Sequence, residues 1–323
     1  MTSPQGAAEG GVAKPRIIVT GAAGLVGQNL VLMLRERGYQ DIVAIDKHAG
    51  NLDVLRGLVP EARIVVGDLA EPGDWEDLFD PESIVVVLHA QITGKYPELF
   101  VRNNLIATER MLAALRASGI RYVVHVSSSV VISVADDDYT RTKRAQEEMV
   151  RNAGFPHCVL RPTLMFGWFD PKHLGWLSRF MAKTPVFPIP GDGCYMRQPL
   201  YIRDFCRALV WAIENRPDGT VYDVVGAHRI DYVDIIRLIK KVKGLRTLIV
   251  HIPVWLFAAL LRLYAVFSAK PPFTADQLEA LSAGDDFKGV DTQAAFGFTQ
   301  TPFEEAIRES YCDPRYSHVL VRR

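Results

Sequence analysis

A tyrosine and a lysine stand four residues apart in the segment ADDDYTRTKRAQEEMV, residues 135–150. On a helix this spacing places Tyr139 and Lys143 on one face. A tyrosine hydroxyl has a pKa of about 10 in water, and a nearby ammonium group lowers that pKa by favouring the phenolate. The pair is therefore a candidate acid/base device. Similar pairs are also common on solvated helix faces, so the rest of the chain has to decide between the two interpretations.

A glycine-rich turn follows the first apolar run of the chain. Residues 16–46 predict a strand, the turn, a helix and a second strand. Gly21 permits a tight turn, Gly24 lets a pyrophosphate approach the backbone, and Gly27 lets the helix pack closely on the strand. Unpaired amides at the start of the helix favour that anion. We expect the cofactor to contact the turn through Gly21, Ala23, Gly24, Leu25, Val26 and Gly27.

An aspartate ends the second predicted strand. Asp46 lies about 20 residues after the turn, where a carboxylate binds the ribose 2′-hydroxyl of a dinucleotide. The same carboxylate would repel a 2′-phosphate, so the sequence favours NAD over NADP as the cofactor.

Further strand-like runs follow at residues 62–69, 83–90, 122–129, 157–167 and 220–226, separated by helical segments. Near-continuous apolar strands alternating with helices predict an α/β protein with a Rossmann-type doubly wound parallel sheet. Active-site residues of such a sheet lie at the carboxyl ends of the strands. The candidates at these ends are Asp68, Gln91, Ser129 and Thr163.

The chain divides into a cofactor-binding part and a smaller, mostly C-terminal substrate-binding part. The predicted parts are a disordered lead-in at 1–13, an NAD-binding domain at 14–163 to which strands near 198–203 and 220–225 return, and a substrate-binding region at 164–197 and 227–315. The later segments are richer in Pro, Trp and Phe, which is typical of loops and short helices that cover a ligand.

Composition and charge exclude several classes of function. The chain has 323 residues, and its 37 basic and 37 acidic residues give a net charge of +0, so there is no electrostatic case for a nucleic-acid partner. The four cysteines include no C-x-x-C pair and no nearby histidine set, so we expect free thiols and no metal site. Free thiols and the lack of a signal-peptide pattern predict a cytoplasmic protein that acts on a small molecule.

One apolar stretch, residues 248–269, is nearly long enough to cross a membrane. Pro253 breaks it and Arg262 interrupts it, so the sequence predicts a buried or interfacial helix. Attachment to a membrane surface is the alternative interpretation.

These features resemble the extended short-chain dehydrogenase/reductase family, also called the NAD-dependent epimerase/dehydratase family, over nearly the whole chain. The matching motifs are TGAAGLVG at the turn, GDL at 67–69, LHAQI at 88–92 and NNLIATERML at 103–112. His89 stands where a small residue is common in the family, and we interpret it as a packed or surface histidine. The resemblance implies cofactor contacts from Asp68, Leu69, Gln91, Asn104, Lys143, Pro162 and Thr163.

In the same frame Tyr139 and Lys143 fit the catalytic Y-x-x-x-K motif of the family. The resemblance favours Ser129 over Ser128 as the hydroxyl that bonds the substrate oxygen, and it implies that Lys143 also holds the nicotinamide ribose. Only about ten residues separate Ser129 from Tyr139, fewer than in sugar-modifying members, so the site is more open there or is closed by something else. Three aspartates at 136–138 precede Tyr139 and predict a cap at the start of the helix. Their negative charge opposes formation of the Tyr139 phenolate.

The substrate is indicated by residues 191–204, GDGCYMRQPLYIRD, which resemble a segment of nucleotide-sugar epimerases. The match implies that Arg197 binds the substrate diphosphate, although a surface arginine in a loop is the alternative. Val130 and Val131 replace the Asp-Glu pair of the 4,6-dehydratases in the family, which disfavours dehydration. A nucleotide-sugar epimerase or keto-reductase remains, and the NAD preference favours the epimerase.

Two rival functions follow from residues 252–267 and 271–281, which resemble family branches with hydrophobic substrates or accessory roles. One is a dehydrogenase/isomerase of a sterol-like or lipid-linked substrate, and the other is a non-catalytic NAD(P)-binding subunit. Arg197 argues against the first, and the intact Ser129, Tyr139 and Lys143 argue against the second. The resemblance also implies a homodimer, formed through the helices that begin near Asn104 and Tyr139.

Overall fold

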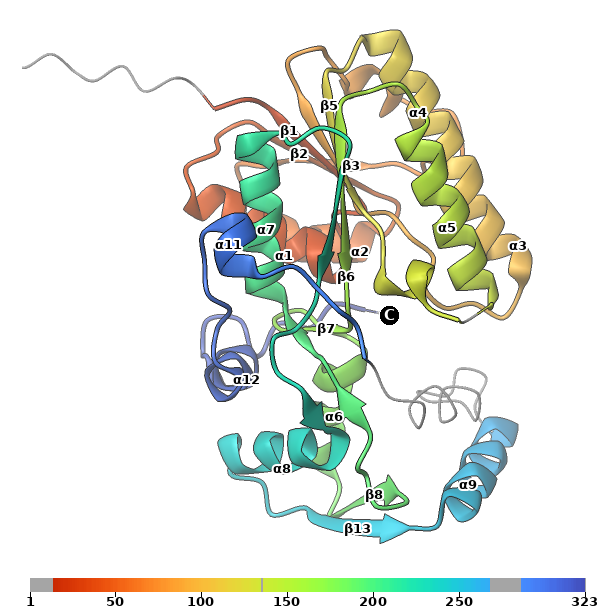
Figure 1. Cartoon of the computed structure of the whole chain (residues 1–323), viewed down its shortest axis with the longest axis vertical. Coiled ribbons are helices and arrows are strands. Elements are labelled where there is room, and N and C mark those ends of the chain that lie inside the picture. The colour runs from red at the N-terminus through yellow and green to blue at the C-terminus, as the bar shows by residue number, and fades with distance from the viewer. Residues whose placement is uncertain (1–13, 135, 268–285, 323) are drawn as a thin grey trace, which may run out of the picture.

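The computed structural model describes residues 14–134, 136–267 and 286–322. The predicted lead-in at 1–13 and the segment 271–281 lie outside these ranges. Figure 1 shows a larger lobe built on a parallel sheet and a smaller lobe below it.

The larger lobe is a seven-stranded sheet with the order β11-β6-β5-β4-β1-β2-β3, in which every pairing is parallel. Its strands are rich in buried β-branched residues, as a sheet covered on both faces requires. The predicted Rossmann-type doubly wound fold is confirmed. The strands are β1 (Ile17–Thr20), β2 (Ile42–Asp46), β3 (Arg63–Val66), β4 (Ile84–Val87), β5 (Tyr122–Val126), β6 (His157–Pro162) and β11 (Thr220–Val224).

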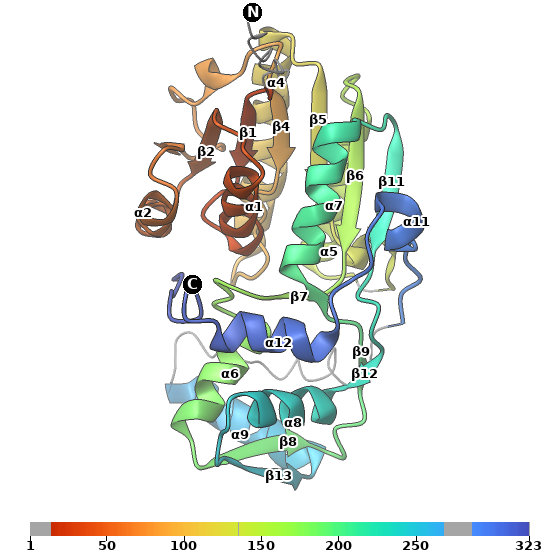
Figure 2. The same ribbon diagram turned by 90° about the vertical axis from the view of Figure 1, so that its left-hand side faces the viewer.

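Helices cover both faces of this sheet. Figure 2 shows α1 and α7 in front of the sheet and α4 behind it. The first face packs against α1 (Leu25–Glu36), α2 (Ala49–Leu58) and α7 (Ile202–Asn215). The second packs against α4 (Ala107–Ser118) and α5 (Asp138–Arg151), with the one-turn helix η1 (Glu76–Leu78) beside them. Before α4 come α3 (Pro97–Phe100) and the π-helical turn η2 (Val101–Ile106).

The segment near 198–203 does not return to the main sheet, contrary to the sequence prediction. Its strand β10 (Leu200–Tyr201) instead pairs with β7 (Met165–Phe166) in a separate two-stranded sheet. The place beside β6 is taken by β11, which pairs with β6 along its whole length. The later of the two predicted strands therefore occupies the position beside β6.

The smaller lobe contains two short two-stranded sheets, β12–β9 and β13–β8, and the helices around them. The helix α12 (Phe303–Cys312) packs on α8, whereas α11 (Thr292–Phe296) packs back on α7 of the larger lobe. The remaining elements are α6 (His173–Lys183), β8 (Val186–Pro190), β9 (Met196–Arg197), β12 (Ile230–Asp231), α8 (Tyr232–Val242), β13 (Leu248–Ile252) and α9 (Val254–Phe267).

The long apolar stretch forms the strand β13 and the helix α9, which are separated by Pro253. Within the described ranges, no helix combines the length and the hydropathy needed to cross a membrane. The sequence predicted a buried or an interfacial helix. The prediction of a buried helix is wrong for two of its residues, because Trp255 is 72% exposed and Leu263 is 58% exposed. Residues 268–269 lie outside the described ranges.

Candidate active site

The glycine turn joins β1 to α1 at the carboxyl edge of the sheet, and two of its glycines are required by the protein itself. Gly21 has φ +69°, and a Cβ there would lie 2.6 Å from the backbone nitrogen of His89. A Cβ on Gly27 would lie 2.5 Å from the Cα of Ala22. Any larger residue would therefore push the turn away from β4 or the helix away from its own turn.

Gly24 is a different case. Its φ is −81°, and a Cβ there would meet only the Gly21 carbonyl oxygen, at an ordinary 3.4 Å. Protein packing therefore leaves open the space that a side chain would fill at the start of α1. No side chain caps α1, and its first turn holds no acidic residue. The exposed cradle and the free helix N-terminus fit the pyrophosphate of a dinucleotide.

Asp46 lies beside this turn at the end of β2. Its carboxylate accepts hydrogen bonds from the backbone nitrogens of Ala23 at 3.0 Å and His48 at 2.9 Å. The acidic group predicted to select NAD is thus held against the glycine turn, and its contact with a ribose stays a prediction.

Asp68 follows β3 and is bound by two basic residues that the sequence analysis missed. Arg102 Nη1 lies 2.8 Å and Lys47 Nζ 3.8 Å from its Oδ2. Burial works to raise the pKa of Asp68, but the hydrogen bonds from Arg102 and the Ala70 backbone and both positive charges lower it overall. The next residue, Leu69, is buried. A cavity beside the pair is lined by Ala70, Glu71, Pro97, Glu98, Val101, Arg102 and Ile106.

Asn104 connects the loop after β4 to α5. It is fully buried, its Oδ1 accepts a hydrogen bond from Gln91 N at 2.6 Å, and its Nδ2 donates to Thr142 Oγ1 at 2.9 Å. Asn104 lies in the π-helical turn η2, a local irregularity that often marks a functional site. The structure thus brings two predicted site residues, Gln91 and Asn104, into direct contact.

Tyr139 lies in the first turn of α5, where Asp137 caps the helix by accepting from Thr140 N at 2.7 Å. The predicted aspartate cap is therefore present. Burial raises the pKa of Tyr139, a hydrogen bond from the Ser128 side chain opposes this, and the Asp137 carboxylate raises it further. The sequence favoured Ser129 as the partner hydroxyl. In the structure Ser128 is the serine that works to lower the pKa of Tyr139, while Ser129 is buried at the start of the short helix η3 (Ser129–Ile132), and the choice between the two stays a prediction.

Lys143 lies one turn further along α5 and is 1% exposed. Its Nζ donates to the Val126 carbonyl at 3.0 Å and to Gln146 Oε1 at 2.6 Å. Burial lowers the pKa of Lys143 to about 7, although Glu147 opposes that effect. The pKa of Tyr139 responds to burial, to Ser128 and to Asp137, and its lowering by Lys143 stays a prediction.

His89 is part of a hydrogen-bonded chain that ends at Lys143. Its Nδ1 lies 3.0 Å from Thr20 Oγ1, and its Nε2 lies 2.9 Å from Thr108 Oγ1. Gln146 Nε2 donates to the same Thr108 oxygen at 2.9 Å. Burial, followed by the charges of Lys143 and Lys47, lowers the pKa of His89 to about 3, so the ring is neutral. Of the two predicted environments, packed or surface, the packed one is observed, and His89 links the end of β1 to α5. Its unusual position in the LHAQI segment was the only sequence signal.

Arg197 and Thr163 lie where the two lobes meet. Arg197 is buried in β9 and pairs with Ile230 of β12, so the alternative of a surface arginine in a loop is wrong. Pro162 ends β6, and the Thr163 hydroxyl donates to the Gln198 carbonyl at 2.8 Å and accepts from Gly226 N at 3.2 Å. In this structure the Thr163 hydroxyl therefore joins the segments of the chain that lead into the smaller lobe.

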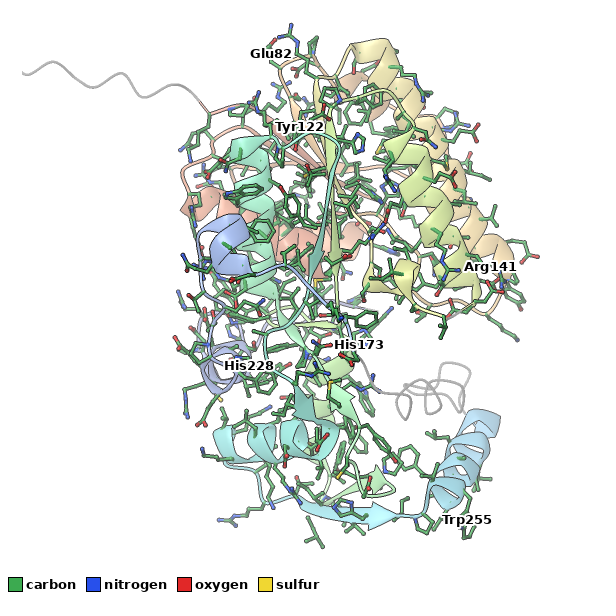
Figure 3. The ribbon with its side chains drawn as sticks, viewed as in Figure 1. Glu82, Tyr122, Arg141, His173, His228 and Trp255 are labelled. Carbon is green, nitrogen blue, oxygen red and sulfur yellow. The ribbon has the colours of Figure 1, made fainter. Side chains whose placement is uncertain are left out.

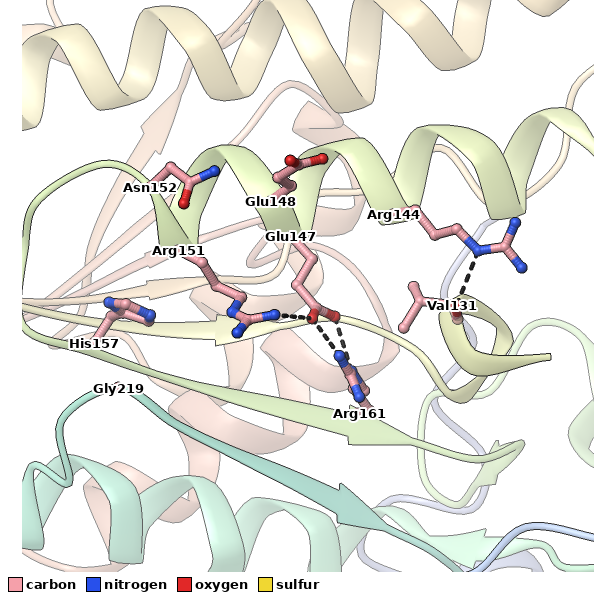
Figure 4. Close-up of a pocket in the computed structure, with 9 residues that line it drawn as sticks. All are labelled: Val131, Arg144, Glu147, Glu148, Arg151, Asn152, His157, Arg161 and Gly219. Atoms are coloured by element: carbon pink, nitrogen blue, oxygen red, sulfur yellow. Dashed lines mark hydrogen bonds and ion pairs between the residues drawn. The ribbon is translucent and has the colours of Figure 1, made fainter.

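A cavity of about 540 Å³ lies between α5, β6 and the start of β11 (Figure 4). Three of its charged side chains have partners, since Glu147 accepts two hydrogen bonds from Arg161 and Arg144 donates to the Val131 carbonyl at 2.9 Å. It contains none of the predicted site residues, and its ion pairs hold α5 on the sheet. The lining residues are Val131, Arg144, Glu147, Glu148, Arg151, Asn152, His157, Arg161 and Gly219.

A parallel sheet of order 3-2-1-4-5-6, a glycine turn with an open helix N-terminus and a carboxylate after β2 define a Rossmann-type dinucleotide-binding protein. The model of the NAD dependent epimerase/dehydratase family matches residues 17–225, and the chain belongs to that family. The predicted class, an NAD-dependent enzyme of the extended short-chain dehydrogenase type, is confirmed, as is NAD as the cofactor.

Individual relatives differ in what they do. The low-salt glycan biosynthesis protein Agl12 of Haloferax volcanii is 27% identical over 64% of this chain and 76% of its own length. The ceramide reductase of Caulobacter vibrioides is 30% identical over 54% of this chain. The matched part covers about half (53%) of the length of that protein. Among solved structures, UDP-glucuronic acid 4-epimerase from Bacillus cereus in complex with NAD matches with a TM-score of 0.65 and 25% identity, over 74% of this chain and 87% of that one.

Proposed function

We propose that this enzyme epimerises or reduces a carbon of a nucleoside-diphosphate sugar, with Tyr139 as the acid/base residue. The observation that carries the proposal is the position of Ser128 beside Tyr139, where its side chain works to lower the pKa of the tyrosine, at the edge of the sheet that also carries the glycine turn. Similarity to the UDP-glucuronic acid 4-epimerase supports the substrate class.

The proposed chemistry assigns a task to each side chain. Bound NAD supplies the acceptor or donor of hydride. As a phenol, the form that its raised pKa favours, Tyr139 donates a proton to the ketone oxygen during reduction. The resulting phenolate takes the proton back from the hydroxyl during oxidation, while Ser128 donates a hydrogen bond to the same oxygen. Lys143, which is held near Val126 and Gln146, orients the nicotinamide ribose.

The diphosphate of the substrate is assigned to Arg197. Its burial in β9, beside the start of the smaller lobe, favours a fixed guanidinium that binds phosphate through two donors. Arg197→Ala would then raise the KM for a nucleotide sugar much more than the Kd for NAD. An equal loss of both would contradict the diphosphate role.

A lipid-linked substrate is the second candidate. The similarity to a ceramide reductase favours it, as do the exposed apolar residues of α9 in the smaller lobe. In this reading the same Tyr139 and Ser128 act on an alcohol or ketone of an amphipathic molecule.

Thermal unfolding in the presence of NAD distinguishes the two candidates. UDP, GDP, dTDP and a ceramide or sterol in detergent would be added separately. A ligand at about 100 times its Kd stabilises the folded state by about 2.7 kcal/mol, which is readily measured. Stabilisation by one nucleoside diphosphate supports the sugar-nucleotide proposal, whereas a response only to the lipid contradicts it and supports the second candidate.

A further inference from the structure

An apolar surface covers the end of the smaller lobe that is remote from the large sheet. Strand pairing places residue 248 of β13 opposite residue 186 of β8, and α9 packs against β8. Figure 3 shows Trp255 at this outer end of the lobe, far from Tyr122 in the large sheet. We call this region the tip surface, and its six exposed apolar residues are Val186, Leu248, Val254, Trp255, Leu260 and Leu263.

The stretch of chain that leads into and through the tip surface is basic, although Arg237 and Lys241 are paired with Asp234 and Glu304. The exposed Asp192 follows Gly191, which approaches Val254. Residues 235–267 contain no aspartate or glutamate, although the whole chain has 37 acidic residues. The same stretch holds six basic residues, namely Arg237, Lys240, Lys241, Lys243, Arg246 and Arg262. A local excess of positive charge in a chain of zero net charge points to an anionic partner.

Two exposed basic residues adjoin the apolar side chains directly. Arg246 stands two positions before Leu248, and Lys183 stands three positions before Val186. The two segments are joined by a hydrogen bond from Leu248 N to the Pro185 carbonyl at 2.8 Å. Among the residues that the structure describes, neither Arg246 nor Lys183 has an acidic partner within ion-pair distance.

We infer that the tip surface binds to an anionic lipid bilayer, with the rest of the protein in the water phase. Exposed leucine and valine side chains would enter the boundary between headgroups and acyl chains. An indole ring such as that of Trp255 suits this boundary because it is apolar with one polar N–H. Lysine and arginine beside such a surface pair with lipid phosphates.

A second copy of the chain fits the tip surface less well than an anionic bilayer does. A two-fold symmetric contact places equivalent patches against each other. Lys183 and Arg246 of one copy would then face basic residues of the other, and residues 235–267 offer no carboxylate to offset the repulsion. The anionic lipid meets both requirements of the surface, apolar contact and negative charge.

Vesicle binding by the full chain tests the inference without NAD or substrate, so its outcome is independent of the proposed reaction. Vesicles of phosphatidylcholine would be compared with vesicles that also contain about 30% phosphatidylglycerol. We expect binding to the anionic vesicles, weaker binding at high salt, and a blue shift of tryptophan emission. Trp255→Phe should retain most of the binding and lose the blue shift.

Matched variants identify the binding surface. Trp255→Ser combined with Leu263→Ser should lower the fraction bound by about tenfold, and Lys183→Glu combined with Arg246→Glu should abolish the preference for anionic vesicles. Leu320→Ser and Arg63→Glu are the controls, since Leu320 is as exposed as Leu263 at 58% and Arg63 is exposed on β3. Stabilisation by NAD reports that each variant is folded.

Three results would overturn the inference. The first is no binding of the wild-type chain to either kind of vesicle. The second is equal binding by the wild type and by folded tip-surface variants. The third is a self-associated species in solution that the Trp255→Ser, Leu263→Ser variant loses, because this would assign the surface to a second copy.

Discussion

Ser128 lies close enough to Tyr139 for its side chain to lower the pKa of the Tyr139 hydroxyl by hydrogen bonding, whereas the neighbouring Ser129 is 5% exposed at the start of a 3-10 helix. The strand β5 ends at Val126, and the serines follow it. We therefore propose Ser128, one position earlier than the family motif suggested, as the hydroxyl that acts with Tyr139.

Substitution of the two serines should separate their roles. Ser128→Ala is expected to lower kcat by about a hundredfold, because loss of one donor to a reacting oxygen has effects of that size. Ser129→Ala serves as the matched control and should change kcat by less than about threefold. The Kd for NAD should stay constant in both variants. A larger loss of kcat in Ser129→Ala than in Ser128→Ala would show that Ser129, which the family motif favoured, is the hydroxyl that bonds the substrate.

The charge of Asp46 should determine the choice of cofactor. Asp46→Asn keeps an acceptor for the backbone of the glycine turn but removes the repulsion of a 2′-phosphate, and Lys47 remains beside it. We expect the Kd for NAD to rise about tenfold and the Kd for NADP to fall. Asp41→Asn, at the other end of β2, is the control and should alter neither. Unchanged discrimination in Asp46→Asn would show that another group selects NAD.

The contacts of His89 should stabilise the packing of α5. His89→Leu removes one hydrogen bond from each of the Thr20 and Thr108 hydroxyls, which costs about 1–3 kcal/mol for the two bonds together. His89→Gln, which retains a donor and an acceptor, should recover part of the loss. Because Gln146 also bonds Thr108, His89→Leu is expected to lower kcat as well. Equal unfolding free energies for the Leu and Gln variants would show that only packing matters at this position.

Lys143 should make the stability of the protein depend on pH. Its pKa is about 7 in the folded state and 10.5 in an ordinary environment, so the unfolded chain binds more protons between these values. Stability from this residue therefore rises with pH across that window, by at most about 1.4 kcal/mol per unit. Lys143→Met should be more stable than the wild type at pH 7, and the difference should shrink towards pH 9. A constant difference would mean that Lys143 is not buried as described.

Local patterns predicted much of the fold. The β1–α1–β2 unit follows from a strand, a glycine turn and a helix that lie within 30 residues of each other. The position of the segment near 198–203 was wrong because competition for the edge beside β6 depends on β11, which comes later in the chain. Pairing of Asp68 with Arg102 was missed for the same kind of reason, since these residues are 34 positions apart.

The site was harder to predict than the sheet. The spacing of Tyr139 and Lys143 suggested a direct electrostatic effect of the lysine on the tyrosine. In the structure the buried Lys143 ammonium donates hydrogen bonds to the Val126 carbonyl and to Gln146. The choice between Ser128 and Ser129 depended on where β5 ends and η3 begins, which a run of three serines does not reveal.

Turnover by Tyr139→Phe tests the proposed mechanism most directly. Once the responding nucleotide is known from thermal unfolding, the variant and the wild type would be assayed with the matching nucleotide sugar, and NAD binding would be measured by calorimetry. If Tyr139 is the acid/base residue, kcat falls by at least about a hundredfold while the Kd for NAD is unchanged. Turnover close to that of the wild type, with NAD bound normally, would contradict the assignment.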